Sequence, residues 1–198
     1  FQIVSQSLQY SRYLKLYSQT VHFPKQNKII DYDIVGHNLK HQFIVCCVYH
    51  SATKTFTLIQ EYSQGNNNLL FGFVSGGFDN KKHLDIDACV KAEVLEEVGY
   101  SDGKLVNLLD YFNNEKRNIG KESEGILEIK WGTNKFYPYL LIDPILSKKE
   151  NERELDYEEY IKIIENITLE ELEEYILNGK FYLPSTQTWF MVKKYLNL

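Results

Sequence analysis

The stretch ACVKAEVLEEVGY, residues 88–100, decides the fold of this chain. On a helix, Glu93, Glu96 and Glu97 stand at positions i, i+3 and i+4, so their three carboxylates share one face. Like charges at this spacing repel each other by roughly 0.2–0.5 kcal/mol per pair. Clustered carboxylate oxygens are the ligands that a hard divalent cation such as Mg²⁺ prefers. The stretch therefore predicts a helix with a metal-binding face.

The residues around this helix supply its boundaries. A glycine-rich turn, SGGFD at residues 75–79, lies upstream, and either Asp85 or Asp87 can accept the hydrogen bond that caps the first turn. Gly99 follows the last apolar residue and is a typical helix stop. We therefore expect the glutamates on a capped helix that begins after a tight turn.

Length and composition bound the class of protein. The chain has 198 residues, with 43% hydrophobic and 25% charged residues, as in a soluble globular protein. We expect an N-terminal extension with strands within residues 1–40 and the main domain over 41–198. The formal net charge of -5 and the lack of a basic stripe argue against a nucleic-acid partner. The apolar run Phe43–Tyr49 is too short to span a membrane and is typical of a buried strand.

Cysteine usage favours a reducing compartment. The chain has three cysteines, and none shows a CxxC pattern or a Cys/His metal spacing. Cys46 and Cys47 are adjacent in a strand-like segment, so their side chains should point to opposite faces of a sheet. We interpret all three as reduced packing residues and expect an intracellular protein, cytoplasmic or mitochondrial, without a recognisable signal or transit peptide.

The remaining pattern predicts strands first, a central helix, further strands and two final helices. A hairpin joins Phe43–Tyr49 to Thr55–Ile59, a capping box begins a helix at Thr168, Gly179 ends it, and a last helix covers Thr186–Leu196. Further strands are expected at 17–23, 29–35, 69–74, 105–111, 136–142 and 160–164, and surface loops at 113–124 and 147–156. This order predicts an α/β (α+β) fold with a mixed sheet and helices on its faces.

Residues 76–100 resemble the Nudix box, which is a glycine, a spacer and then Arg-Glu-(apolar)-x-Glu-Glu-x-Gly-(apolar). The run AEVLEEVGY, residues 92–100, matches every position of that second half except the arginine, which is Ala92. The flanks are similar to ADP-ribose and nucleoside-diphosphate-sugar pyrophosphatases of this family. That similarity covers LIQEYS at 58–63, GFVSGGFD at 72–79, and the tail segments 158–163, 168–172 and 178–180.

The resemblance implies a Nudix-type α/β/α sandwich around a mixed sheet, with a small N-terminal antiparallel sheet. It implies hydrolysis of ADP-ribose or another nucleoside-diphosphate sugar to a nucleoside monophosphate and a sugar phosphate, with Mg²⁺ or Mn²⁺ as cofactor. In such enzymes the small N-terminal sheet often forms a homodimer. We therefore expect either a homodimer through the N-terminal strands or a subunit of a larger assembly.

The resemblance also assigns roles to residues. Glu93, Glu96 and Glu97 would bind the metal, and Glu97 also enters the catalytic set. The backbone at Gly76 and Gly77 would approach the metal and the phosphates. Three further assignments follow for the late and inserted segments: Glu158 or Glu159 would orient or deprotonate the attacking water, and Arg117 would contact phosphate.

The chain also departs from the family pattern. The box arginine is Ala92, and the glutamate that pairs with it falls on Leu84, although two extra residues alter the spacing and place His83 or Asp85 near that position. The upstream phosphate-binding arginine corresponds to Ser63, and the strand glutamate corresponds to Gly72.

These losses motivate two alternative hypotheses. One is a catalytically weak or inactive Nudix-fold subunit of a larger complex, for example a mitochondrial one. The other is a nucleotide sensor that binds without turnover.

Overall fold

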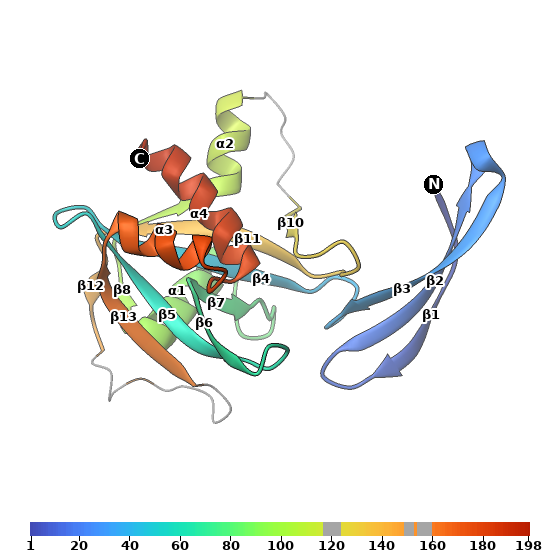
Figure 1. Cartoon of the computed structure of the whole chain (residues 1–198), viewed down its shortest axis with the longest axis horizontal. Coiled ribbons are helices and arrows are strands. Elements are labelled where there is room, and N and C mark those ends of the chain that lie inside the picture. The colour runs from blue at the N-terminus through green and yellow to red at the C-terminus, as the bar shows by residue number, and fades with distance from the viewer. Residues whose placement is uncertain (117–123, 149–152, 154–159) are drawn as a thin grey trace. The chain divides into compact units, whose positions relative to one another are not determined.

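The structure is a computed structural model that describes residues 1–116, 124–148, 153 and 160–198. The chain forms two compact units (Figure 1). The first combines Phe1–Gln42 with Gly125–Phe136, and the second combines Phe43–Glu124 with Tyr137–Leu198. The domain division expected after residue 40 stays a prediction.

The first unit contains a three-stranded antiparallel sheet in the order β1-β2-β3. Its strands are β1 (Gln2–Ser11), β2 (Lys15–Phe23) and β3 (Lys28–Gly36), and the 3-10 turn η1 (Pro24–Gln26) joins the last two. The strands expected at 17–23 and 29–35 are therefore confirmed. β1 was not foreseen from the sequence. All of its residues are exposed, so no buried face imposes an alternation of apolar and polar residues.

A mixed eight-stranded sheet forms the centre of the fold. Its main order is β10-β11-β4-β5-β13, with β6 paired to β5, β7 to β4 and β9 to β11. Their bounds are β4 (Gln42–His50), β5 (Thr55–Ser63), β6 (Asn68–Gly72), β7 (Val74–Gly77), β9 (Lys104–Asn107), β10 (Ile126–Leu127), β11 (Lys135–Ile142) and β13 (Ile161–Ile167). A separate two-stranded ribbon pairs β8 (Tyr100–Ser101) with β12 (Ile145–Leu146).

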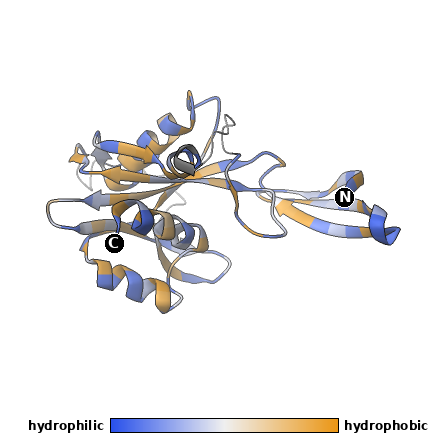
Figure 2. Ribbon diagram, turned by 90° about the horizontal axis from the view of Figure 1, so that it is seen from above, coloured by the Kyte–Doolittle hydropathy of each residue, from blue (hydrophilic) through white to orange (hydrophobic). Residues whose placement is uncertain are grey.

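Helices cover both faces of the central sheet (Figure 1). α1 (Ile86–Val98) lies on one face, and α3 (Leu169–Leu177) and α4 (Leu183–Leu196) lie on the other. The strands between them are mainly hydrophobic (Figure 2). On the α1 face the buried core contains Ile44, Cys46, Val48, Ile59, Val74, Cys89, Val90, Val94, Val98, Tyr100, Tyr137, Tyr139, Leu141 and Ile161.

Aromatic pairs fix the opposite face. The Phe56 and Trp189 rings meet edge to face at 5.1 Å between centroids, and the Phe73 and Phe181 rings do so at 5.3 Å. Because both faces are covered, the adjacent thiols of Cys46 and Cys47 are both fully buried. The expectation that these cysteines pack inside the protein is confirmed.

The strand expected over residues 105–111 is wrong in its second half. β9 ends at Asn107, and α2 (Leu108–Lys116) begins at the next residue. The Asn107 side chain accepts the backbone N–H of Asp110 at 3.1 Å, which is the bond of a helix N-cap. The loop expected at 113–124 therefore starts inside α2.

Other helix boundaries are set by residues at the helix ends: a capping box, a glycine and a proline. Thr168 and Glu171 form the expected capping box, and Gly179 follows the end of α3 with a left-handed φ of +67°. α4 begins at Leu183, three residues before the expected Thr186, with a proline in its first turn. None of the helices in the described part of the chain has the length and apolar character needed to cross a bilayer.

Candidate active site

α1 is held at both ends by its own sequence. Asp85, rather than Asp87, is the N-cap, and its carboxylate accepts the Ala88 N–H at 2.8 Å. Gly99 ends the helix with a left-handed φ of +75°, and a Cβ at this position would lie 2.2 Å from the carbonyl oxygen of Lys148. Only glycine satisfies both conditions, so the last turn, which carries Glu96 and Glu97, has a fixed position.

Glu93 packs directly on the backbone of β7. A Cβ on Gly76 would lie 1.9 Å from the carboxyl carbon of Glu93 and 2.2 Å from its Oε1. The carboxylate therefore occupies the space that any other residue at position 76 would fill with its side chain. This contact brings the glycine-rich turn and the first glutamate together.

Glu97 lies one turn further along α1 and is buried, with 4% of its surface exposed. Its Oε2 accepts the backbone N–H of Ser75 at 3.3 Å, and its backbone carbonyl accepts a hydrogen bond from the Arg153 guanidinium. A buried carboxylate is costly unless it is hydrogen-bonded. Burial strongly raises the pKa of the nearby Cys46 thiol, and the charge of Glu97 adds to that rise.

The other predicted site residues fall into two groups. Glu96 is half-buried on α1 and immediately precedes Glu97. Gly77 follows Gly76 at the end of β7. The assignments to Arg117, Glu158 and Glu159 lie outside the described residues, so these roles stay predictions.

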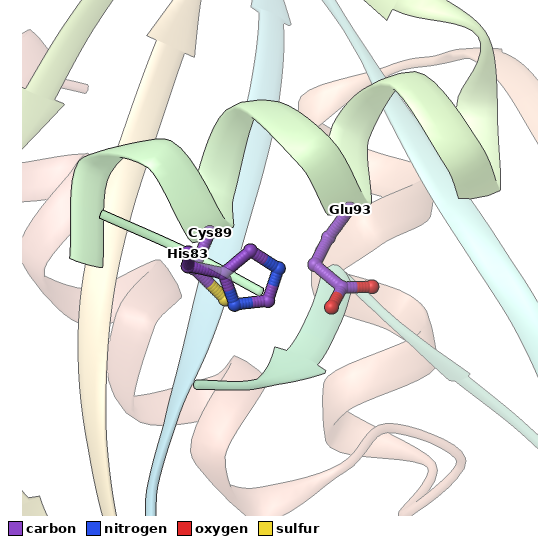
Figure 3. Close-up of side chains that lie close together, drawn as sticks. All are labelled: His83, Cys89 and Glu93. Carbon is purple, nitrogen blue, oxygen red and sulfur yellow. The ribbon is translucent and has the colours of Figure 1, made fainter. Parts of the chain in front are cut away.

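Three unlike side chains meet beside Gly76. His83, Cys89 and Glu93 each offer a ligand atom, and these atoms lie within 4.8 Å of one another. Cys89 and Glu93 project from the same side of α1 toward the His83 ring (Figure 3). Burial raises the pKa of the Cys89 thiol to about 12, and the charge of Glu93 adds to the rise.

Cys89 is thus more than the packing residue that the sequence indicated, and the cluster was not predicted. The available signal was the spacing of Cys89 and Glu93, which are four residues apart and therefore share a helix face. His83 lies in the preceding turn, so its position depends on how that turn folds.

The two positions at which the sequence lacks the ion pair of the Nudix pattern carry no buried charge. Leu84 is 92% exposed, and its side chain points into solvent. Ala92 is half-buried and carries no charge that needs a partner. Removing both members of an ion pair is tolerated, whereas removing one would strand a charge.

At the end of β6, α4 fills the space beside Gly72. A Cβ there would lie 3.1 Å from Cδ2 of Tyr182 and 3.2 Å from Oγ of Ser185. Ser185 Oγ also accepts the Phe73 N–H at 3.1 Å, and Ser63 lies near the Tyr182 hydroxyl and lowers its pKa. Tyr182 thus lies beside both Gly72 and Ser63, the two upstream positions that differ from the pattern that the sequence resembles.

Oxygen donors around Gly76 suit a hard cation. Glu93 supplies a carboxylate at Gly76, Glu97 supplies one at the adjacent Ser75 N–H, and Gly76 can supply a backbone carbonyl. Mg²⁺ and Mn²⁺ are bound by such oxygens. The glycine-sized space that receives the Glu93 carboxylate is consistent with an ion held between α1 and β7.

No protein-family model matches this chain, and no curated protein matches it in sequence. Its fold is similar to a solved structure described as "Crystal structure of ADP compounds hydrolase", with a TM-score of 0.70 and 17% sequence identity. The match covers 99% of this chain and 94% of that chain. At this identity the likeness shows the fold, so the expected α/β fold with helices around a mixed sheet and with a small antiparallel sheet is confirmed.

Proposed function

We propose that this chain is a Nudix hydrolase that cleaves a nucleoside diphosphate linked to a sugar, such as ADP-ribose, into a nucleoside monophosphate and a sugar phosphate. One observation carries the proposal: the Glu93 carboxylate occupies the space that a Cβ on Gly76 would take. The fold is consistent with it, because its structural neighbour is described as an ADP compounds hydrolase.

Glu93, Glu96 and Glu97 would hold Mg²⁺ or Mn²⁺, together with the backbone at Gly76. Such an ion, when bound, lowers the pKa of a water and stabilises negative charge on phosphoryl oxygens. Three carboxylates on one helix face would otherwise repel a diphosphate. The proposed site therefore needs a cation for binding as well as for chemistry.

The backbone of β7 has a positioning role in this proposal. The Ser75 N–H holds the buried carboxylate of Glu97 and so fixes its orientation toward β7. Gly76 and Gly77 present backbone without a Cβ, which allows a phosphate group to approach closely. Glu158 or Glu159 would orient or deprotonate the attacking water, and Arg117 would bind phosphate.

A second candidate is a catalytically weak or inactive Nudix-fold subunit of a larger assembly. The observation that favours it is the contact of Tyr182 with Gly72 and Ser63, where related enzymes carry a glutamate and an arginine. In that case the glutamates of α1 would be retained for structure. A compartment such as the mitochondrion, and a homodimer through β1–β3, also remain proposals.

One assay separates the two candidates. The purified protein with Mg²⁺ is offered ADP-ribose and UDP-glucose, and the release of AMP, UMP and sugar phosphate is measured. We expect product from the native chain and a loss of about 10²–10³-fold in kcat/KM for Glu97→Gln, because the substitution keeps the shape of the side chain but removes its charge. The matched control is Glu174→Gln, an exposed glutamate on α3. Equal turnover in the native chain and Glu97→Gln would reject the enzyme assignment.

A further inference from the structure

The cluster of His83, Cys89 and Glu93 has the dimensions of a metal site. Ligands bound at about 2.0–2.3 Å around a tetrahedral ion lie roughly 3.3–3.8 Å apart. The three ligand atoms here lie within 4.8 Å of one another, so small side-chain rotations bring them to that spacing. The carbonyl oxygens of Gly76 and Gly77 lie 4.0 and 3.7 Å from the Cys89 Sγ and border the same space.

The backbone fixes the parts of the cluster before any ion binds. Cys89 and Glu93 are one turn apart on α1, whose first turn is capped by Asp85. The turn that carries His83 is closed by the His83 N–H, which donates to the carbonyl of Asp79 at 2.8 Å. The side chains therefore need little ordering to converge, which favours binding.

The donor set differs in kind from the carboxylate set proposed for Mg²⁺. A thiolate is a soft ligand and an imidazole a borderline one, and both favour Zn²⁺ or Co²⁺ over Mg²⁺. Two protein ligands of this kind with one carboxylate leave a fourth position for a backbone carbonyl or a water.

We propose that His83, Cys89 and Glu93 form a binding site for a transition-metal ion of the Zn²⁺ class. The ion replaces the thiol proton of Cys89, which is released to solvent, and forms a metal–sulfur bond. An ion on His83 Nδ1 would also compete with the 3.3 Å hydrogen bond from the Asp79 N–H to that nitrogen. That bond is long, so the ion displaces little.

The shared ligand gives this site a consequence for the proposed hydrolase. Glu93 cannot serve both ions fully, so Zn²⁺ at the cluster withdraws one carboxylate from the Mg²⁺ site. This consequence rests on the proposed function, whereas the binding site itself does not. Zn²⁺ would then inhibit Mg²⁺-dependent hydrolysis.

The test is a titration of the full chain with Co²⁺, followed by Zn²⁺ in competition, without any substrate. We expect one ion per chain and a thiolate-to-cobalt charge-transfer absorption, which Zn²⁺ abolishes. Cys89→Ser should lose the absorption, and His83→Gln should weaken binding about 10–100-fold. The matched controls are Cys47→Ala, a buried cysteine outside the cluster, and His22→Gln, and both should bind as the native chain does.

Two results would overturn the proposal: no charge-transfer absorption in the native chain, or the same absorption in Cys89→Ser. Circular dichroism shows that each variant is folded, and Cys89→Ala provides a second variant if the serine is not tolerated. Because the measurement is an absorption spectrum, it tests metal binding even if the chain has no hydrolase activity. In an active chain, Zn²⁺ should inhibit the native protein at least about 10-fold more strongly than Cys89→Ser.

Discussion

Gly76 and Gly72 lie four residues apart, and each leaves a space that another side chain uses in a different way. At Gly76 the space receives the charged end of Glu93, which is half-buried. At Gly72 it is bordered by Tyr182, the N-cap of α4, and by Ser185 of α4, which hydrogen-bond to Phe71 and Phe73. β7 is therefore arranged for a charged group, whereas the end of β6 is closed by packing.

The sharpest test of this difference is Gly76→Ala. The new Cβ would lie 1.9 Å from the Glu93 carboxyl carbon, so the carboxylate has to move by more than 1 Å. A displacement of that size costs about 10²-fold in kcat/KM when the group positions the reacting atoms. The measurement is Mg²⁺-dependent hydrolysis. The control is Gly65→Ala, where the space around the new Cβ is open to 4 Å. Full activity in Gly76→Ala would show that Glu93 does not act from this position.

Gly72→Ala should affect stability rather than catalysis. The new Cβ would lie 3.1 Å from Tyr182 and 3.2 Å from Ser185, and Ser185 is held by its bond to Phe73. Overpacking of this kind costs about 1–3 kcal/mol, and the loss of glycine flexibility in the unfolded chain offsets about 0.4–1 kcal/mol of it. We expect a net loss of about 1 kcal/mol in the free energy of unfolding, measured by urea denaturation, with kcat/KM unchanged. A large loss of activity would mean that this end of β6 belongs to the site.

Tyr182→Phe should have the smallest effect at neutral pH, a loss of at most about 1 kcal/mol, because it removes a single polar contact. Burial raises the pKa of Tyr182, the charge of Glu61 adds to the rise, and the nearby Ser63 opposes it. The unfolded chain therefore loses this proton first, from about pH 10, so stability falls as pH rises from there through the folded-state pKa.

Tyr182→Phe should lack the part of the alkaline loss of stability that comes from this hydroxyl. Urea midpoints from pH 9 to 11 measure it, and the exposed Tyr160→Phe serves as the control. An unchanged decline in Tyr182→Phe would show that the hydroxyl is not closed off by α4.

The sequence predicted the elements whose boundaries are set by residues next to them in the chain. The limits of α1 could be predicted because Asp85 and Gly99 act on the turn they belong to. The capping box at Thr168 is local in the same way. β1 could not be predicted because an exposed strand carries no hydrophobic period. The start of α2 at Leu108 was missed, although Asn107 carried the capping signal.

The same difference between local and long-range information applies to the residues of the candidate site. The approach of Glu93 to Gly76 was expected through the family resemblance. The closure of Gly72 by Tyr182 joins residues more than 100 positions apart, and nothing in the spacing of the sequence encodes it. The His83–Cys89–Glu93 cluster lies between these cases, because its helical pair is local and its histidine depends on a folded turn.

The reactivity of the three buried thiols can also report where the protein opens locally. Cys46 and Cys47 sample the two faces of β4, while Cys89 samples the helix that covers one of them. A thiol reagent can reach each sulfur only through a fluctuation that uncovers it, and regions of a protein open with different free energies. The three labelling rates, assigned by peptide mapping, would therefore report whether α1 detaches from the sheet alone or only when the whole core opens.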